Sequence, residues 1–488
     1  MIQTVYATCA GHVLCEQAMA RRTDIMVTVA LLLMLSGGVQ ARADAPTVTV
    51  AQSQSDDEKP AAPALGERQT ASEVADDSDR LLSLRCPDPA RAWRHWECVG
   101  QAIGEPLTRW GAEFRRFLGT LGIVTVASYT AQLMGNPIGG RQQGFTYAGS
   151  LDALIAWDLQ RLLRVPGLSF TISANWSTGK GLSFEDIDNI WNVQSAFTGP
   201  VQVSLQQMYL EQQFLDGNLS IAAGRLAAAN TFATLPVFYN YLNSAINPVA
   251  GALSFNDLAF SQSPPGVEWG AQIVYKPIVP LQIALGVYDT NPFAAAGANH
   301  GVDFSFQEGN KGILTVVQLT YRLNHGKGDT GLPGEYAIGA LYDTNAFDLL
   351  DTGSGTVSGN YVVYAMFQQM VYRDGDVSSR RGLTLWGEVT ISPRQSASLI
   401  PYFVGGGLSY RGLVPTRGKD IASLGAISGI FSRHVRGASA ETVIEANYYA
   451  ALPYGLSVTP DVQYVIKPSG SSRIKNALVL GVQLAVTF

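Results

Sequence analysis

Apolar and polar residues alternate along one segment after another between Gly122 and the end of the chain. In GLSFTISANWS, residues 167–177, apolar residues alternate with serine, threonine and asparagine from Leu168 onward. The segment RGLTLWGEVTIS and the last residues, VLGVQLAVTF, follow the same period of two. Because a period of two places successive side chains on opposite faces of a β-strand, the pattern predicts a long series of strands, each with an apolar and a more polar face.

The apolar faces of these strands could form the core of a soluble sandwich or could face lipid. Two observations favour lipid. Tight connections such as LPYG at 452–455 alternate with long loops rich in glycine and asparagine, such as 291–311, as in outer-membrane barrels. Aromatic residues, among them Trp157, Trp176 and Tyr448, stand near strand ends, where the membrane interfaces would lie. In lipid only a closed barrel pairs every strand edge.

We therefore predict an all-β fold, a transmembrane antiparallel β-barrel over residues 119–488. At roughly 20 to 25 residues per strand and loop, about 16 strands fit, and 14 or 18 fit nearly as well. A barrel of this size encloses an aqueous channel. Its last strand must pair with its first, and we expect the outer-membrane assembly machinery to recognise that strand through the terminal Phe488.

The chain begins with the features of a secretory signal peptide. The apolar run at 26–39 is too short to span a membrane comfortably, follows two arginines and precedes the small-residue pattern Ala41-Arg42-Ala43. Residues 1–43 are therefore predicted to direct export. The residues before Met19 fit no signal peptide, so Met19 is the expected start of translation.

Two further segments precede the predicted barrel. Residues 44–80 are polar, acidic and rich in proline and alanine, which predicts a disordered linker. In residues 81–118 apolar side chains recur at helical spacing, as in Leu107, Trp110 and Phe114, which predicts a short amphipathic helical segment in the periplasm.

Cysteine and histidine usage indicates neither a metal site nor a cofactor. After export only Cys86 and Cys98 remain, and they either close one disulfide loop or stay as two thiols. The only nearby histidine is His95, and none of the five histidines forms a ligand spacing with another. No nucleophile elbow with assignable partners occurs either, so the sequence does not predict an enzyme.

Charge usage also restricts the partners. Charged residues make up 15% of the chain, against about 25% in typical soluble proteins. The formal net charge is −6, and no basic stripe with interleaved aromatic residues is present. The sequence therefore predicts no nucleic-acid partner.

Five stretches of the chain resemble the carbohydrate-selective porins of the OprB family, over about residues 105–488. They are GFTYAGSLDALIAWDLQRLL, ANWSTGKGLS, MYLEQQFLDGNLSIAAGRLAA, SYRGLVPTRGKDIASLGAISGIFS and ETVIEANYYAALPYGLSVTPDVQYVIKPSG. The resemblance implies a channel of 16 strands in the outer membrane of a Gram-negative bacterium, passing sugars or other small neutral solutes by diffusion. Lipid and lipopolysaccharide would surround it. Monomer and trimer stay open, because a subunit interface and a lipid face are both apolar.

Selection among uncharged sugars requires hydrogen-bonding side chains and flat rings in a narrow part of the lumen. Strand parity predicts a set of pore-lining, solute-contacting candidates, with the alternative that they only keep the lumen wet. These candidates are Trp386, Glu388, Arg411, Glu445, Asn447, Tyr449, Asp461 and Gln463.

The resemblance adds Glu211 and Arg225 to the pore-lining candidates. Parity places Arg225 on the apolar face together with Ile221. A bulge at Gly224 would turn Arg225 into the lumen, and without a bulge it would meet lipid headgroups.

The sequence is also compatible with two alternative functions. One is a porin for general or other small solutes, and the other is a structural barrel that tethers the envelope through residues 44–118. Replacing lumen side chains would alter selective flux only in a porin, whereas deleting residues 44–118 would weaken the envelope only if the barrel is a tether.

Overall fold

The computed structural model describes residues 111–487, apart from 112, 198, 200, 262–266, 291–299, 303–304, 307–311, 327 and 352–354. All of these belong to one compact unit, Pro60–Phe488. The predicted signal peptide, the linker, the Cys86/Cys98 pair and Phe488 lie outside the described residues. So does most of the predicted helical segment 81–118; its last residues, 113–118, are helical, and the helix continues to residue 120.

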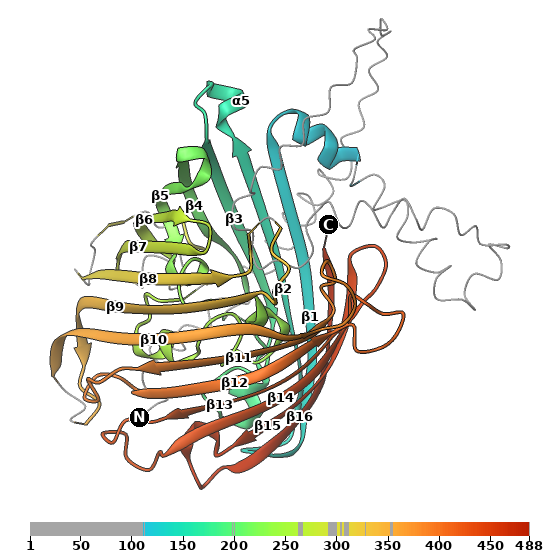
Figure 1. Ribbon diagram of the computed structural model, residues 1–488. Helices are drawn as coiled ribbons and strands as arrows, with labels where there is room; N and C mark the ends of the chain where they lie inside the picture. The colour runs from blue at the N-terminus through green and yellow to red at the C-terminus, as the bar shows by residue number, and fades with distance from the viewer. Residues whose placement is uncertain are drawn as a thin grey trace, which may run out of the picture. The chain divides into compact units, whose positions relative to one another are not determined.

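The described residues form sixteen strands that close into one antiparallel barrel (Figure 1). The strands are β1 Ile123–Gly140, β2 Phe145–Asp158, β3 Leu168–Gly179, β4 Gln202–Phe214, β5 Leu219–Ala227, β6 Val267–Ile278, β7 Leu281–Asp289, β8 Ile313–Leu323, β9 Gly334–Asp348, β10 Thr356–Arg373, β11 Gly382–Ile391, β12 Tyr402–Arg411, β13 Ile421–Ile430, β14 Ala440–Ala451, β15 Leu456–Ile466 and β16 Lys475–Thr487. Each strand pairs with its chain neighbours. The predicted fold class and strand number are confirmed.

The last strand closes the ring, as its alternation predicted. β16 runs antiparallel to β1, with Gln132 opposite Gln483 and Leu133 opposite Val482. Gln132 donates to Gln483 across this seam inside the barrel, at 2.9 Å between Nε2 and Oε1. Closure leaves the barrel without a free sheet edge between its first and last strands.

The three longest connections all lie at the same end of the barrel. At one end, which we call the short-turn end, β6 joins β7 and β14 joins β15 through tight turns. At the other, the long-loop end, long segments join β3 to β4, β5 to β6 and β7 to β8. In outer-membrane barrels the short turns face the periplasm and the long loops face outward.

Apart from the helical residues 113–120, which precede β1, the helices of the described residues lie in the connections between strands. The α-helices are α5 Leu159–Leu163 and α6 Ala252–Asn256, and the other helical turns are η3 Ser183–Ile187, η4 Leu215–Gly217, η5 Ala228–Asn230, η6 Pro236–Asn240 and η8 Pro468–Gly470. At the start of α5 the Asp158 carboxylate accepts from the Gln160 N–H at 3.0 Å, which caps the helix. Within the described part of the chain, no helix combines the length and apolar character needed for a membrane crossing.

The outer face carries exposed aliphatic side chains between two rows of aromatic residues. Near the short-turn end, Tyr321, Tyr336 and Phe367 stand side by side on β8, β9 and β10. Nearer the long-loop end, Tyr342 of β9 stands opposite Tyr361 of β10. Tyr336 and Tyr342 are about 20 Å apart along the strand at the rise of an extended chain. This spacing suits the apolar band of roughly 25 Å expected of an outer-membrane barrel.

The aromatic residues singled out from the sequence also lie near strand ends on the outer face. Trp157 stacks on Phe170 near the short-turn end, with ring centroids 5.7 Å apart. Trp176 lies toward the opposite end of β3. Tyr448 lies toward the short-turn end, where its hydroxyl donates to Asp420 at 2.6 Å. Asp420 also binds the Arg417 guanidinium, so this contact fastens the turn before β13 to β14.

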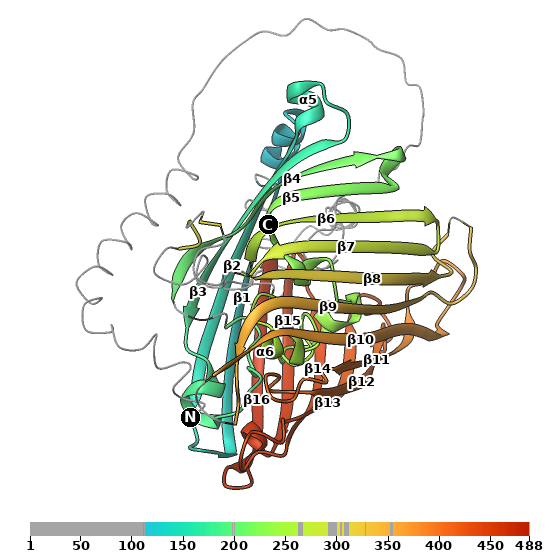
Figure 2. The same cartoon turned by 90° about the vertical axis from the view of Figure 1, so that its left-hand side faces the viewer.

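Two of the long connections enter the barrel and form its hydrophobic core with the wall. We call residues 180–197 the first inner segment and residues 228–261 the second inner segment. Figure 2 shows α6, which belongs to the second, inside the ring of strands. The two segments bind each other through Ser244 N to Asn192 O at 2.8 Å and Ser195 N to Leu242 O at 2.9 Å.

Candidate functional site

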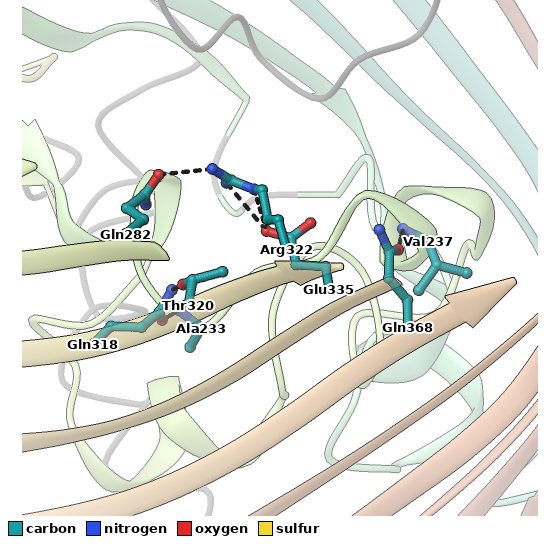
Figure 3. A network of polar contacts seen from close by, with 8 residues as sticks. All are labelled: Ala233, Val237, Gln282, Gln318, Thr320, Arg322, Glu335 and Gln368. Atoms are coloured by element: carbon teal, nitrogen blue, oxygen red, sulfur yellow. Dashed lines mark hydrogen bonds and ion pairs between the residues drawn. The ribbon is translucent and has the colours of Figure 1, made fainter. Parts of the chain in front are cut away.

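The second inner segment follows the inside of the wall from β8 to β15. Two lumen-facing glutamines of the wall hold the first part of this segment. Gln318 of β8 accepts from the Ala233 N–H at 2.8 Å, and Gln368 of β10 accepts from the Val237 N–H at 3.0 Å (Figure 3). Each side chain satisfies a buried backbone donor that has no strand partner.

Trp386 of β11 holds the next part of the segment. Its ring meets Phe238 and Tyr241 edge-on, with centroid distances of 5.4 and 5.3 Å. Its Nε1–H donates to the Tyr241 hydroxyl at 2.7 Å. A Cβ at Gly425 would lie 2.8 Å from the Tyr241 ring and 2.9 Å from Trp386, so only glycine allows this close approach. Trp386 is 2% exposed, which makes it an anchor of the inner segment in this structure.

Glu445 of β14 holds the far part of the segment. Its carboxylate accepts from the Leu242 N–H at 2.6 Å and from the Asn243 N–H at 3.0 Å. The Asn447 amide donates to the same carboxylate at 2.8 Å. These three hydrogen bonds make Glu445 a polar anchor of the second inner segment.

Gln463 of β15 joins the two inner segments. It accepts from the Asn243 side chain at 2.8 Å and donates to the Val193 carbonyl at 2.9 Å. Asp461 orients it, because Gln463 Nε2 also donates to Asp461 Oδ1 at 2.8 Å. Both side chains face the lumen side of the wall and are buried there.

The anchors of the first inner segment are residues that the sequence reasoning missed. Glu441 of β14 accepts from the Ile190 N–H at 3.0 Å, and Gln132 of β1 accepts from the Ala196 N–H at 3.0 Å. Glu441 has the same strand parity as Glu445, so the alternation of β14 could have identified it as lumen-facing. The sequence contains no local signal for the segment that binds it.

A strip of charged side chains lines the lumen wall toward the short-turn end. We call Glu211, Lys276, Arg322 and Glu335 the charged strip. Arg322 donates to Glu335 Oε1 from Nε at 3.1 Å and to Gln282 from Nη1 at 2.9 Å (Figure 3). The Arg322 and Glu335 side chains are 32% and 10% exposed. The strip carries two positive and two negative charges, which balance.

The other end of the strip lies on β4 to β6. Glu211 accepts from the Ser220 hydroxyl at 2.8 Å, and Lys276 lies within electrostatic range of both Glu211 and Arg322. Glu211 was a candidate from the sequence, whereas Lys276, Arg322 and Glu335 were not. Strand parity could have identified all three as lumen-facing.

The remaining sequence candidates lie on the lumen side at other places. Glu388 is 5% exposed, and its carboxylate oxygens have no hydrogen-bond partner among the described residues. Asn447 is buried beside Glu445. Arg411 and Tyr449 are half-buried near the short-turn end of β12 and β14. Solute contact by these side chains stays a prediction.

The structure corrects the expectations for Arg225. It stands opposite Met208 and Trp269 without a register shift, so β5 has no bulge at Gly224 and Arg225 keeps the outward parity. It does not reach headgroups either, because it is 1% exposed. Its guanidinium donates to the carbonyls of Gly301 and Val267, so part of the β7–β8 connection covers it.

The end of the second inner segment is fixed at the long-loop end. Asn256 of α6 exchanges two hydrogen bonds with the backbone of Ile400, at 2.7 and 2.9 Å. The next residue, Asp257, accepts from the Ala259 N–H at 3.1 Å through one oxygen. Its other oxygen has no hydrogen-bond partner among the described residues. Burial raises the pKa of the Asp257 carboxyl well above its usual range, and the Asp343 carboxylate raises it further.

Asp257 should make the stability of the inner segment depend on pH. Because the folded-state pKa is raised above the unfolded value of 3.8, the folded protein holds a proton that the unfolded chain releases. The contribution of this proton to stability is fully present below the unfolded pKa of 3.8. It is lost as the pH rises toward the folded-state pKa. We expect Asp257→Asn to flatten the fall in thermal unfolding temperature between acidic and neutral pH, measured by circular dichroism. An unchanged pH profile in this variant would contradict the assignment.

This chain is similar to known proteins in both structure and sequence. The chain is similar in structure to OprB of Pseudomonas putida, in a high-pH structure, with a TM-score of 0.71 and 23% identity over 78% of this chain and 97% of that one. It is 26% identical over 408 residues to Porin B of Pseudomonas aeruginosa, which covers 74% of this chain and 86% of the relative. The profile of the carbohydrate-selective porins, the OprB family, matches residues 142–488. This chain therefore belongs to the OprB family of carbohydrate-selective porins.

Proposed function

We propose that small neutral sugars pass through this porin by passive diffusion, along the side of the lumen that carries the charged strip. Porins of this family are channels rather than enzymes, and they lie in the outer membrane of Gram-negative bacteria. Membership of a carbohydrate-selective family supports sugars as the solutes. The position of the second inner segment supports a lumen that is narrowed for solutes. The segment lies inside the wall, where its anchors run from β8 to β15.

The balance of charge in the strip is the observation that carries this proposal. Two acids and two bases face the lumen there, so the strip gives no net attraction to ions of one sign. A guanidinium has five N–H donors, and Arg322 directs three of them to Gln282 and Glu335. The remaining donors and the carboxylate oxygens are suited to hydroxyl groups. Neutral polyhydroxylated solutes are therefore favoured over ions.

Arg322 should contribute directly to the preference for sugars. We expect Arg322→Gln to lower the ratio of monosaccharide to amino-acid permeation about tenfold or more, since a hydrogen bond to a charged group contributes about 1.5 kcal/mol or more. Glu335→Gln should instead introduce a preference for anions, because it leaves a net positive charge. Swelling of liposomes that contain the purified protein measures both effects with solutes of matched size.

The chain offers a matched control for these substitutions. Lys180 and Glu185 form an exposed ion pair at 3.6 Å in the first inner segment, away from the charged strip. Neutralising either residue should leave the sugar preference unchanged. If wild-type liposomes admit all solutes by size alone, the protein is a general porin. If they admit none, a structural barrel becomes the better account.

We also propose how the chain reaches and occupies its membrane. The apolar run at 26–39 supports export by residues 1–43, and the pairing of β16 with β1 supports recognition of the last strand and Phe488 by the assembly machinery. The exposed aliphatic and aromatic outer face supports contact with lipid and lipopolysaccharide. The same face suits a monomer or a trimer.

A further inference from the structure

The helical turn η6 of the second inner segment has two different faces. Val237 and Phe238 are buried against the wall, at 4% and 0% exposure. Pro236 is exposed, and Tyr239 is half-exposed. Because a 3₁₀ helix has three residues per turn, Pro236 and Tyr239 lie on one face. That face points away from the wall, so it borders the lumen.

The same turn lies next to the charged strip. Val237 is bonded to Gln368, and Gln368 stands opposite Glu335 in the pairing of β10 with β9. Glu335 in turn stands opposite Arg322 in the pairing of β9 with β8. Figure 3 shows Val237 beside Gln368, with the Arg322–Glu335 pair on the neighbouring strands. The lumen therefore has an apolar face and a charged, hydrogen-bonding face close together at this height.

We propose that Tyr239, with Pro236, is a platform for the ring of a pyranose sugar, while Arg322 and Glu335 bind its hydroxyls. A pyranose has a rigid C–H face and a rim of hydroxyl groups, which matches two faces of different polarity. An open-chain polyol has the hydroxyls without the rigid face. The porin therefore favours cyclic sugars over open-chain polyols of the same size. This inference rests on the proposed function and adds ring recognition to it.

The platform is held in place before a sugar arrives. Pro236 has a fixed backbone φ, and the next two residues are anchored by Gln368 and by the Trp386 ring. Two residues after Tyr239, the Tyr241 hydroxyl lies 3.1 Å from the carbonyls of Leu408 and Leu424. A sugar that packs on Tyr239 therefore does not have to order the backbone beneath it, which favours binding.

Liposome swelling with glucose and with its open-chain reduction product, glucitol, tests this inference. We expect wild-type protein to admit glucose about two- to tenfold faster, the range given by an aromatic contact of about 0.5–1.5 kcal/mol. Tyr239→Ala should bring the ratio close to one, and Tyr239→Phe should keep it, because the ring and not the hydroxyl forms the platform. Arg322→Gln should slow both solutes alike.

The controls separate failure of this inference from failure of the proposed function. Tyr402→Ala alters an exposed tyrosine on the outer face, and it should leave the ratio unchanged. If wild-type protein prefers sugars over amino acids but Tyr239→Ala keeps the glucose to glucitol ratio, the platform is wrong and the sugar porin stands. If sugars have no advantage over amino acids in wild type, the proposed function itself fails. Heat-modifiable gel migration confirms that each variant is folded.

Discussion

Replacing Glu445 by alanine is expected to release the second inner segment and to raise the single-channel conductance in planar bilayers. The substitution leaves the buried Leu242 and Asn243 N–H groups without their acceptor. Each unsatisfied buried group costs about 1–3 kcal/mol, so the population with a displaced segment should rise at least tenfold. The sugar preference should fall at the same time, because the Tyr239 face moves away from the charged strip.

Two variants calibrate this result. Glu445→Gln keeps one acceptor oxygen and should give an intermediate conductance. Glu185→Ala removes an exposed carboxylate of the first inner segment and should leave the conductance unchanged. A folded Glu445→Ala barrel with wild-type conductance and wild-type sugar preference would show that this carboxylate does not position the segment.

Replacing Trp386 by alanine is expected to widen the channel rather than only to weaken sugar binding. Loss of a buried tryptophan costs about 3–5 kcal/mol. Here it removes the ring contacts with Phe238 and Tyr241 and the hydrogen bond to the Tyr241 hydroxyl. Liposome swelling with sugars of increasing size should show a higher size limit and a smaller difference between mono- and disaccharides.

The size series distinguishes an anchor from a residue that contacts solute. If Trp386 contacts sugars directly, its loss should slow sugars of every size and leave the size limit unchanged. Trp157→Ala is the matched control, because this tryptophan lies on the outer face against Phe170. It should alter neither the size limit nor the sugar preference.

Strand parity predicted the lumen side of the wall well, because a period of two depends only on neighbouring residues. Trp386, Glu445 and Gln463 all face inward, as their alternation indicated. Parity does not tell what covers an inward side chain. Glu445 binds the backbone of Leu242, 203 residues away along the chain, and nothing local in either stretch predicts that contact.

The sequence analysis also missed the Arg322–Glu335 pair and misjudged the surroundings of Arg225, for related reasons. Alternation in β8 and β9 places Arg322 and Glu335 on the lumen side, but it does not show that the two side chains stand opposite each other across the turn between these strands. Arg225 interrupts an otherwise apolar face, which suggested a bulge, but the structure instead covers it with the backbone at Gly301. In both cases the contact partner comes from a neighbouring strand or loop, and the segment's own pattern does not identify it.

The most direct test of this account is to locate a sugar in the lumen. Crystals of the full-length porin soaked with an iodine-labelled glucose would report its position through anomalous scattering. The account predicts a peak between Tyr239 and the Arg322–Glu335 pair, and its loss in crystals of Arg322→Gln. Iodine ordered only elsewhere in the lumen, with the site between these residues unoccupied, would contradict it.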